Sequence, residues 1–208
     1  MTLNSLAIEL NKTIEQENPH IYRMLSNLGK EMFYPKGILS QSAEAKKQAK
    51  PKYNATIGIA TENGGPLHFS HIQDHLTEFS PEDIYPYAPV VGKAPLREAW
   101  KDKIVKDNPS LQGKKFGLPI VTNALTHGLS IVGDLFVEPG DAIITPDKYW
   151  GNYNLTFGIR RGAKVVKYEL FNEGFEFNTK GLQEAVMAQK DAGKAIVILN
   201  FPNNPTGY

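Results

Sequence analysis

Apolar and polar segments alternate most regularly after Gly117. The predicted strands are short apolar runs at 118–122, 142–145, 164–169 and 195–200. The predicted helices between them are the longer stretches 124–137, about 151–161 and 179–191, with a turn at Pro139-Gly140-Asp141. Strands that alternate with helices need crossover connections. The pattern therefore predicts an α/β fold with a mostly parallel, doubly wound sheet that is covered on both faces.

The first part of the chain predicts helices with no strand between them. Residues 3 to about 50 have a helical pattern that breaks at Asn18-Pro19, where Asn can cap and Pro can begin a new helix. The segment from Gln41 to Lys50 is rich in Ala and Lys and has little to bury, so we expect a solvated helix there. We therefore treat residues 1–54 as a helical N-terminal segment.

Residues 55–92 form a second predicted region with few regular signals. A short strand is predicted at 55–60, and Asn63-Gly64-Gly65-Pro66 predicts a turn after it. The rest is rich in proline and tyrosine and predicts an extended loop, which in compact proteins is usually functional or packed on a partner. A helix from Ala94 to about Lys106 then opens the third predicted region, residues 93–208.

Composition and charge narrow the function classes. The 208 residues include 23 Lys and Arg and 22 Asp and Glu, giving a net charge of +1. Basic residues are not concentrated in any stretch, so we expect no nucleic-acid partner. Cysteine is absent, which excludes disulfides and cysteine nucleophiles. No signal-like N-terminus and no apolar stretch of membrane-spanning length is found, so we expect a cytoplasmic protein without membrane contact.

Two rival sites have weak support. His68, His71 and His75 are close in sequence, and the last two would share a face in a helix, but the stretch lacks a firm helical signal. We therefore expect no metal. No Gly-x-Gly-x-x-Gly follows any predicted strand, which argues against dinucleotide binding.

The junction at 119–127 is a candidate anion site. A predicted strand runs directly into a helix there, and the first N–H groups of a helix lack internal partners and carry partial positive charge. Thr126 adds a hydroxyl. The alternative is that Thr122 or Asn123 simply caps the helix.

The last residues point to a specific family. The apolar run 195–200 predicts a strand that is buried on both faces, and ligands of parallel sheets bind beyond the carboxyl ends of such strands. Asn204-Pro205-Thr206-Gly207 follows, and it resembles the Asn-Pro-Thr-Gly turn of class I/II pyridoxal-phosphate aminotransferases. The resemblance, which runs from about residue 50 to 208, implies the large domain of the pyridoxal-phosphate transferase fold, in incomplete form.

The resemblance also implies roles for individual residues. Ala124, Leu125 and Thr126 match the phosphate-binding positions of a pattern like Thr-x-Gly-Ala-Ser/Thr, although Leu125 is bulkier than the usual residue. Trp150, in Trp-Gly-Asn, corresponds to the aromatic residue that stacks on the pyridine ring in aspartate and aromatic aminotransferases. Asn204 would donate to the phenolic oxygen of the cofactor.

Two further residues match more distant parts of the pattern. Tyr87, in Tyr-Ala-Pro-Val-Val-Gly, corresponds to a tyrosine that reaches the phosphate of the neighbouring subunit, which implies a homodimer with shared active sites. Gly58 lies near the position of a substrate-binding glycine.

The resemblance implies an enzyme that transfers an amino group between an amino acid and a 2-oxo acid. The family's Schiff-base lysine, the acidic partner of the pyridine nitrogen and the carboxylate-binding arginine all follow the Asn-Pro-Thr-Gly turn, so we expect them beyond Tyr208 and expect this chain alone to be inactive. Two alternatives stay open. One is a pyridoxal-phosphate lyase on the same fold, and the other is a non-catalytic α/β binding or dimerisation module.

Overall fold

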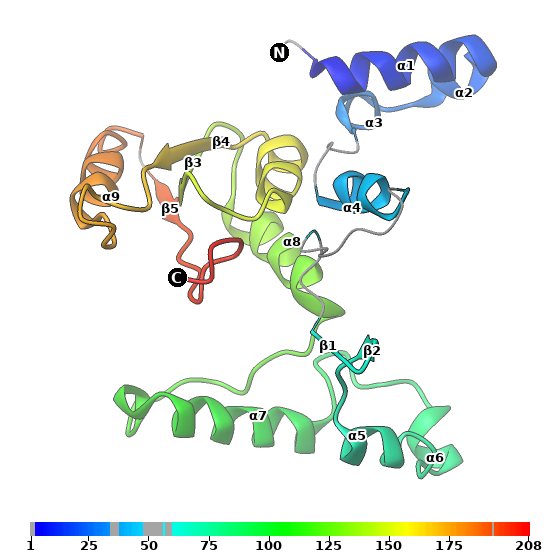
Figure 1. Ribbon diagram of the computed structural model, residues 1–208, viewed down its shortest axis with the longest axis vertical. Coiled ribbons are helices and arrows are strands. Elements are labelled where there is room, and N and C mark those ends of the chain that lie inside the picture. The colour runs from blue at the N-terminus through cyan, green and yellow to red at the C-terminus, as the bar shows by residue number, and fades with distance from the viewer. Residues whose placement is uncertain (1–2, 34–37, 48–55, 57–59, 193) are drawn as a thin grey trace. The chain divides into compact units, whose positions relative to one another are not determined.

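The computed structural model describes residues 3–33, 38–47, 56, 60–192 and 194–208. Contacts divide the chain into two units (Figure 1). Unit 1 combines Met1–Phe33 with Thr122–Tyr208, and unit 2 is Tyr34–Val121. The predicted boundaries after residues 54 and 92 follow the order of the chain, whereas the two units follow contacts in space. Those boundaries therefore stay a prediction.

A three-stranded parallel sheet forms the centre of unit 1. Its strands are β3 (Ala142–Pro146), β4 (Lys164–Tyr168) and β5 (Ala195–Val197), in the order β4-β3-β5. In the register, Ile143 lies opposite Val165 on one side and Ile196 on the other. Every residue of β3 is buried, as expected for a central strand of a parallel sheet.

Helices cover the sheet on both sides (Figure 1). They are α8 (Ala124–Phe136), the π-helix η2 (Asn154–Ile159) and α9 (Thr179–Met187). Val137, Ile143, Tyr153 and Phe157 form a buried cluster between the sheet and the layer of α8 and η2. The α/β prediction is thus confirmed. The predicted helix 151–161 is also present, as a helix over 152–161 whose middle has π-helical turns.

The N-terminal part of unit 1 is helical, as predicted. It contains α1 (Ser5–Glu17), α2 (Pro19–Met24) and α3 (Asn27–Glu31). The break at Asn18-Pro19 is confirmed, because the Asn18 side chain accepts from the Ile21 N–H and Pro19 occupies the first helical position. The Asn11 side chain donates to the Lys30 carbonyl over 2.8 Å and ties α1 to the end of α3.

Unit 2 consists of short elements and one longer helix. They are α4 (Ile38–Lys47), β1 (Thr61–Glu62), β2 (Gly65–Pro66), α5 (Ser70–His75), α6 (Pro81–Ile84), α7 (Ala94–Asp107) and the 3₁₀-helix η1 (Pro109–Leu111). The predicted turn connects β1 and β2, with positive φ at Asn63 and Gly64. The short helices α5 and α6 interrupt the predicted extended loop, and the predicted strand 55–60 lies largely outside the described residues.

Two strand predictions need correction. The predicted strand 118–122 is not a strand in the structure. Its backbone bonds within unit 2 instead, where the Val121 N–H donates to the Val91 carbonyl and Arg97 donates to the Pro119 carbonyl. The predicted strand 195–200 is shortened to β5, although the Ile198 N–H still donates to the Ile144 carbonyl. It is also not buried on both faces, because β5 is an edge strand of the described sheet and Val197 is 38% exposed.

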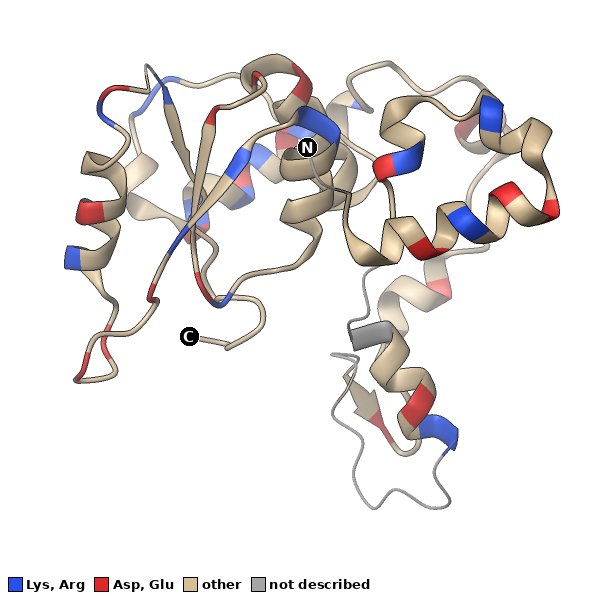
Figure 2. Cartoon of the chain, turned by 90° about the horizontal axis from the view of Figure 1, so that it is seen from above, with Lys and Arg blue, Asp and Glu red and all other residues tan. Residues whose placement is uncertain are grey.

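Charges of both signs are interspersed over the described helices (Figure 2). None of the described helices combines the length and the apolar composition that a membrane span requires.

Candidate active site

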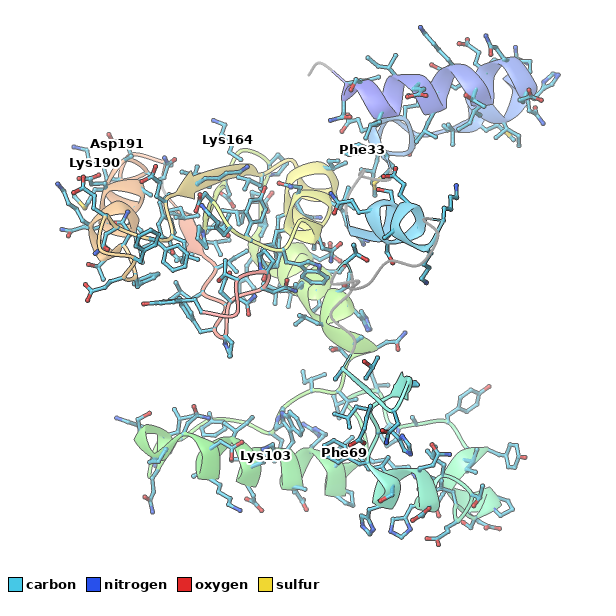
Figure 3. All side chains as sticks on the ribbon, viewed as in Figure 1. Phe33, Phe69, Lys103, Lys164, Lys190 and Asp191 are labelled. Atoms are coloured by element: carbon cyan, nitrogen blue, oxygen red, sulfur yellow. The ribbon has the colours of Figure 1, made fainter. Side chains whose placement is uncertain are left out.

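The candidate site residues of unit 1 lie where the strands end. Lys164, Lys190 and Asp191, labelled in Figure 3, mark the edge of the sheet at which β4 and β5 begin. Loop 147–152 leaves β3 at the opposite edge, and the turn 201–207 follows β5 there. Ligands of open parallel sheets bind beyond this carboxyl edge.

The N-terminus of α8 is open to an anion. Asn123 makes no side-chain capping bond, and the Thr122 hydroxyl instead donates to the Ala124 carbonyl over 3.1 Å. Neither Thr122 nor Asn123 therefore caps α8 with its side chain, so the alternative prediction is wrong. The N–H groups of Leu125 and Thr126 have no carbonyl four residues earlier within the helix, so they remain available to a ligand.

Ala124 has an unusual backbone conformation at this corner. Its φ is 66°, a left-handed value that costs a residue with a side chain about 1–2 kcal/mol. The resemblance pattern has glycine at this position, which adopts such a φ without that cost. Ala124 is therefore a departure from the pattern in addition to Leu125.

Asn152, where loop 147–152 enters the helix over 152–161, connects this loop to the first turn of α8. Its side-chain amide donates to the Thr126 hydroxyl over 3.0 Å. This contact brings the Trp-Gly-Asn segment to the predicted phosphate-binding residues. Asn152 itself was not among the predicted site residues, although it is the last residue of the Trp-Gly-Asn match.

Trp150 is fixed by packing and remains partly accessible. Its half-buried ring packs against the core cluster and meets the buried Tyr153 edge to face, with ring centroids 5.7 Å apart. An edge-to-face pair of this kind adds about 0.5–1.5 kcal/mol to the energy of burial. Trp150 is therefore held in one orientation at the base of the loop.

Asn203 and Asn204 have different environments despite being neighbours. Asn203 is 4% exposed, donates to the Lys148 carbonyl over 3.1 Å and accepts from the Thr206 N–H and hydroxyl. Asn204 is exposed, and its peptide bond to Pro205 is cis. The buried Asn203 thus ties the last turn to loop 147–152, and Asn204 is left free to contact a ligand. Asn203 was missed by the sequence prediction.

Asp147 anchors the start of the same loop. Its carboxylate accepts from the Leu170 N–H over 2.9 Å and pairs with the Lys148 ammonium. Burial raises the pKa of the Asp147 carboxyl, but the Lys148 ammonium and the Leu170 N–H outweigh burial, so the pKa lies below its usual value. The ionised form therefore stabilises the loop.

Two buried hydroxyls lie near this edge of the sheet. The Thr145 Oγ1 and Tyr168 OH atoms are buried and have no hydrogen-bond partner among the described residues. Burial raises the pKa of the Tyr168 phenol. These groups make the ends of β3 and β4 less stable than fully paired strand ends would be.

The structure does not bring all predicted site residues together. The three segments that carry Thr126, Trp150 and Asn204 are joined by the Asn152 and Asn203 hydrogen bonds. Tyr87 belongs to unit 2, where its side chain is fully exposed. Gly58 lies outside the described residues.

The histidines of unit 2 are the rival metal site that the sequence offers. His71 and His75 lie in α5 with ring centroids 4.3 Å apart, and His75 contacts the Glu78 carboxylate. In the described part of the chain, no group of three or more His, Asp or Glu residues could hold a metal ion.

The donors at the carboxyl edge fit a phosphorylated aromatic ligand. Open N–H groups and the Thr126 hydroxyl suit a phosphate, the Trp150 ring suits a flat heterocycle, and the Asn204 amide suits a phenolate oxygen. The described residues thus offer partner groups for three parts of pyridoxal phosphate, namely the phosphate, one face of the ring and the phenolic oxygen.

Comparison with solved structures defines the class of fold. An aminotransferase from Anaerococcus prevotii matches with a TM-score of 0.72 and 26% identity, over 89% of this chain and 46% of that chain. The fold is accordingly that of the pyridoxal-phosphate transferases.

Comparison with protein families identifies the group more closely. A match to "Aminotransferase class I and II" spans residues 70–208, so this chain belongs to that family. The aspartate aminotransferase of Bacillus subtilis is 25% identical over 83% of this chain and 42% of that protein. The aspartate/prephenate aminotransferase of Thermus thermophilus is 30% identical over 58% of this chain and 30% of that protein. The chain thus spans less than half the length of these relatives.

Proposed function

We propose that this chain forms the N-terminal part of a pyridoxal-phosphate aminotransferase and supplies one side of its cofactor site. The observation that supports this proposal most directly is a pair of hydrogen bonds at the carboxyl edge of the sheet. Asn152 donates to Thr126 and Asn203 donates to Lys148, and together they join the start of α8, loop 147–152 and the last turn. Pyridoxal phosphate, when bound, withdraws electrons from the α-carbon of an amino acid so that the amino group can be transferred.

Each residue has a binding or orienting role in this proposal. The N–H groups of Leu125 and Thr126, with the Thr126 hydroxyl, bind the phosphate at the start of α8. The Trp150 ring limits the tilt of the pyridine ring and excludes water from one of its faces. The Asn204 amide donates to the phenolic oxygen and so favours its ionised form.

No residue of this chain is assigned to the covalent step. The Schiff-base lysine is expected beyond Tyr208, and we expect the chain alone not to transfer amino groups. The substrates we propose are an amino acid and a 2-oxo acid. The names of the two relatives favour aspartate as the amino donor. A cytoplasmic location stays a prediction from the sequence.

We also propose that the protein is a homodimer. Supporting this, the loop region of unit 2 exposes large apolar side chains, which is typical of an interface. They include Phe69, labelled in Figure 3, and also Ile72, Tyr85, Tyr87 and Val90. In the dimer, Tyr87 would reach the phosphate bound by the partner subunit. Light scattering should give twice the mass of one chain, and a monomer at micromolar concentration would contradict the proposal.

The cofactor site can be tested with pyridoxamine phosphate. This ligand has no aldehyde, so it does not react with surface lysines. The chain contains two tryptophans, and in a Trp100→Phe variant Trp150 alone reports binding by its fluorescence. We expect pyridoxamine phosphate to quench Trp150 and to bind at least about tenfold more tightly than pyridoxamine, or ~1.4 kcal/mol.

A lack of preference for the phosphorylated ligand would contradict the proposed site. A chain with the circular dichroism of an α/β fold that binds both compounds equally, or neither, would contradict the phosphate site. The non-catalytic module would then be the better interpretation. If the isolated chain does not fold, the full-length protein is titrated with the same two ligands instead.

A further inference from the structure

We propose that Asn152 is a positioning residue that directs the Thr126 hydroxyl toward a phosphate bound at the start of α8. Asn152 thereby raises the preference of the site for phosphorylated over unphosphorylated ligands. This inference rests on the proposed function, because it assumes that the ligand phosphate binds at this helix terminus.

The argument begins with the hydrogen-bonding capacity of the Thr126 hydroxyl. A hydroxyl can donate one hydrogen and accept two. The Asn152 amide donates to Thr126 Oγ1 over 3.0 Å and therefore occupies one acceptor position. The hydroxyl hydrogen then points away from Asn152 and is available to an anion. Accepting a hydrogen bond also polarises the hydroxyl and makes it a better donor.

Thr126 is suited to this task, whereas the other threonine at this corner is not. The Thr122 hydroxyl donates to the Ala124 carbonyl over 3.1 Å, so its hydrogen is already used. The backbone N–H groups of Leu125 and Thr126 are available on the same turn of α8 as the Thr126 hydroxyl. Orienting that one hydroxyl therefore completes a donor set for phosphate.

Asn152 is held in place by its neighbours on both sides. The N–H of Tyr153 donates to the Trp150 carbonyl over 3.1 Å, and the N–H of Asn154 donates to the Gly151 carbonyl over 3.2 Å. Tyr153 is buried in the core cluster, and Trp150 packs against it. A donor on a backbone that is fixed in this way loses little entropy when it orients Thr126.

The experiment compares pyridoxamine phosphate with pyridoxamine in the Trp100→Phe background. We expect Asn152→Ala to weaken binding of pyridoxamine phosphate about fivefold, the value of one ordinary hydrogen bond, and to leave pyridoxamine unchanged. Thr126→Val should cause at least the same loss. The double variant should bind no more weakly than Thr126→Val alone, because Asn152 acts through the hydroxyl that this variant lacks.

Asn152→Asp is a second variant of nearly the same size. Its carboxylate would accept from the Thr126 hydroxyl, turn the hydrogen away from the ligand and add negative charge. We expect a larger loss of pyridoxamine phosphate binding than with alanine, and no loss of pyridoxamine binding, because pyridoxamine has no phosphate. This variant also provides the test if Asn152→Ala does not fold.

Failure of the inference and failure of the proposed function give different results. If the unmodified site does not prefer pyridoxamine phosphate, the proposed function is wrong. If it does and Asn152→Ala keeps the full preference, the positioning role is wrong. Equal weakening of both ligands would show that Asn152 only supports the loop, which also overturns the inference.

Discussion

The side-chain amide of Asn203 donates a 3.1 Å hydrogen bond to the backbone carbonyl of Lys148, which joins the last turn of the chain to the loop after β3. The two residues are 55 positions apart in the sequence. Asn203 is buried, whereas Asn204 beside it is exposed. The two asparagines therefore separate a structural role from a proposed binding role at adjacent positions.

Asn203→Ala should reduce stability, whereas Asn204→Ala should reduce ligand binding. Asn203→Ala leaves the Lys148 carbonyl and the Thr206 donors without their partner, so we expect a loss of about 2–4 kcal/mol in the free energy of unfolding. Asn204→Ala should change it by less than about 0.5 kcal/mol and weaken pyridoxamine phosphate binding. Urea unfolding and the fluorescence titration measure these effects. Equal destabilisation by both variants would contradict the assignment.

Replacing Ala124 with glycine should stabilise the protein. The left-handed φ of 66° is unfavourable for alanine, and glycine removes that strain while adding entropy to the unfolded chain. We expect a net gain of about 0.5–1 kcal/mol in urea unfolding. The control is Ala99→Gly, in the middle of α7, which should cost about 1 kcal/mol. A loss of stability in Ala124→Gly would show that the corner is not strained.

Stability should fall in acid partly because of Asp141. The Lys194 ammonium, 2.8 Å away, and the Glu138 N–H hold the pKa of the Asp141 carboxyl below its usual value. Because the folded-state pKa lies below the unfolded value of about 4, this contribution is present above that pH and is lost as the pH falls through the folded pKa. The midpoint of urea unfolding, measured across about pH 2–6, should depend less steeply on pH in Asp141→Asn than in the unmodified chain.

Lys194→Met is the matched partner variant for this prediction. It removes the ammonium and should reduce the same slope, and the double variant should lose little more than either single variant. Additive effects of the two substitutions would mean that the pair is not coupled.

Removing either of the two unpartnered hydroxyls should stabilise the protein. Thr145→Val and Tyr168→Phe each remove a buried oxygen that has no partner among the described residues, so each should stabilise the fold by about 1 kcal/mol. Tyr149→Phe is the control, because its hydroxyl donates to the Asn154 side chain over 2.9 Å, and it should cost about 1 kcal/mol. Thermal unfolding of the three variants checks the signs.

Tyr168 should also affect the stability of the fold at alkaline pH. Burial raises the pKa of its phenol, so the neutral form stabilises the fold below the unfolded pKa of about 10, and this contribution is lost as the pH rises through the folded pKa. Tyr168→Phe should therefore unfold less readily in alkali than the unmodified chain. An unchanged alkaline midpoint would mean that Tyr168 is accessible to solvent.

The sequence predicted the parts of the fold that depend on local pattern. The strands β3 and β4 and the helices α8 and α9 follow from apolar runs and helical periodicity, and the turn before β2 follows from Asn63 and Gly64. The pattern could not predict which segments pair in space. Residues 118–122 are apolar enough for a strand, but their backbone partners lie in unit 2.

The residues that organise the site could not be found in the same way. Asn152 and Asn203 act through hydrogen bonds across 26 and 55 positions, and no local pattern encodes such a distance. Asn152 is part of the Trp-Gly-Asn resemblance, but the resemblance assigns a role only to Trp150. Asn203 had no signal beyond its place before Asn204-Pro205. The left-handed Ala124 could have been inferred from the glycine in the resemblance pattern.

The order of the two units along the chain has a consequence for biosynthesis. Unit 1 is assembled from Met1–Phe33 and Thr122–Tyr208, and all of unit 2 is translated between them. Helices α1, α2 and α3 leave the ribosome before unit 2, yet they must wait for the later residues before the rest of their own unit exists. Unit 2 can complete its local hydrogen bonds during that interval, because nascent chains fold from the amino terminus as segments become available. Apolar residues of α1 such as Ile8 and Leu10 are therefore accessible to a nascent-chain chaperone while unit 2 is being made.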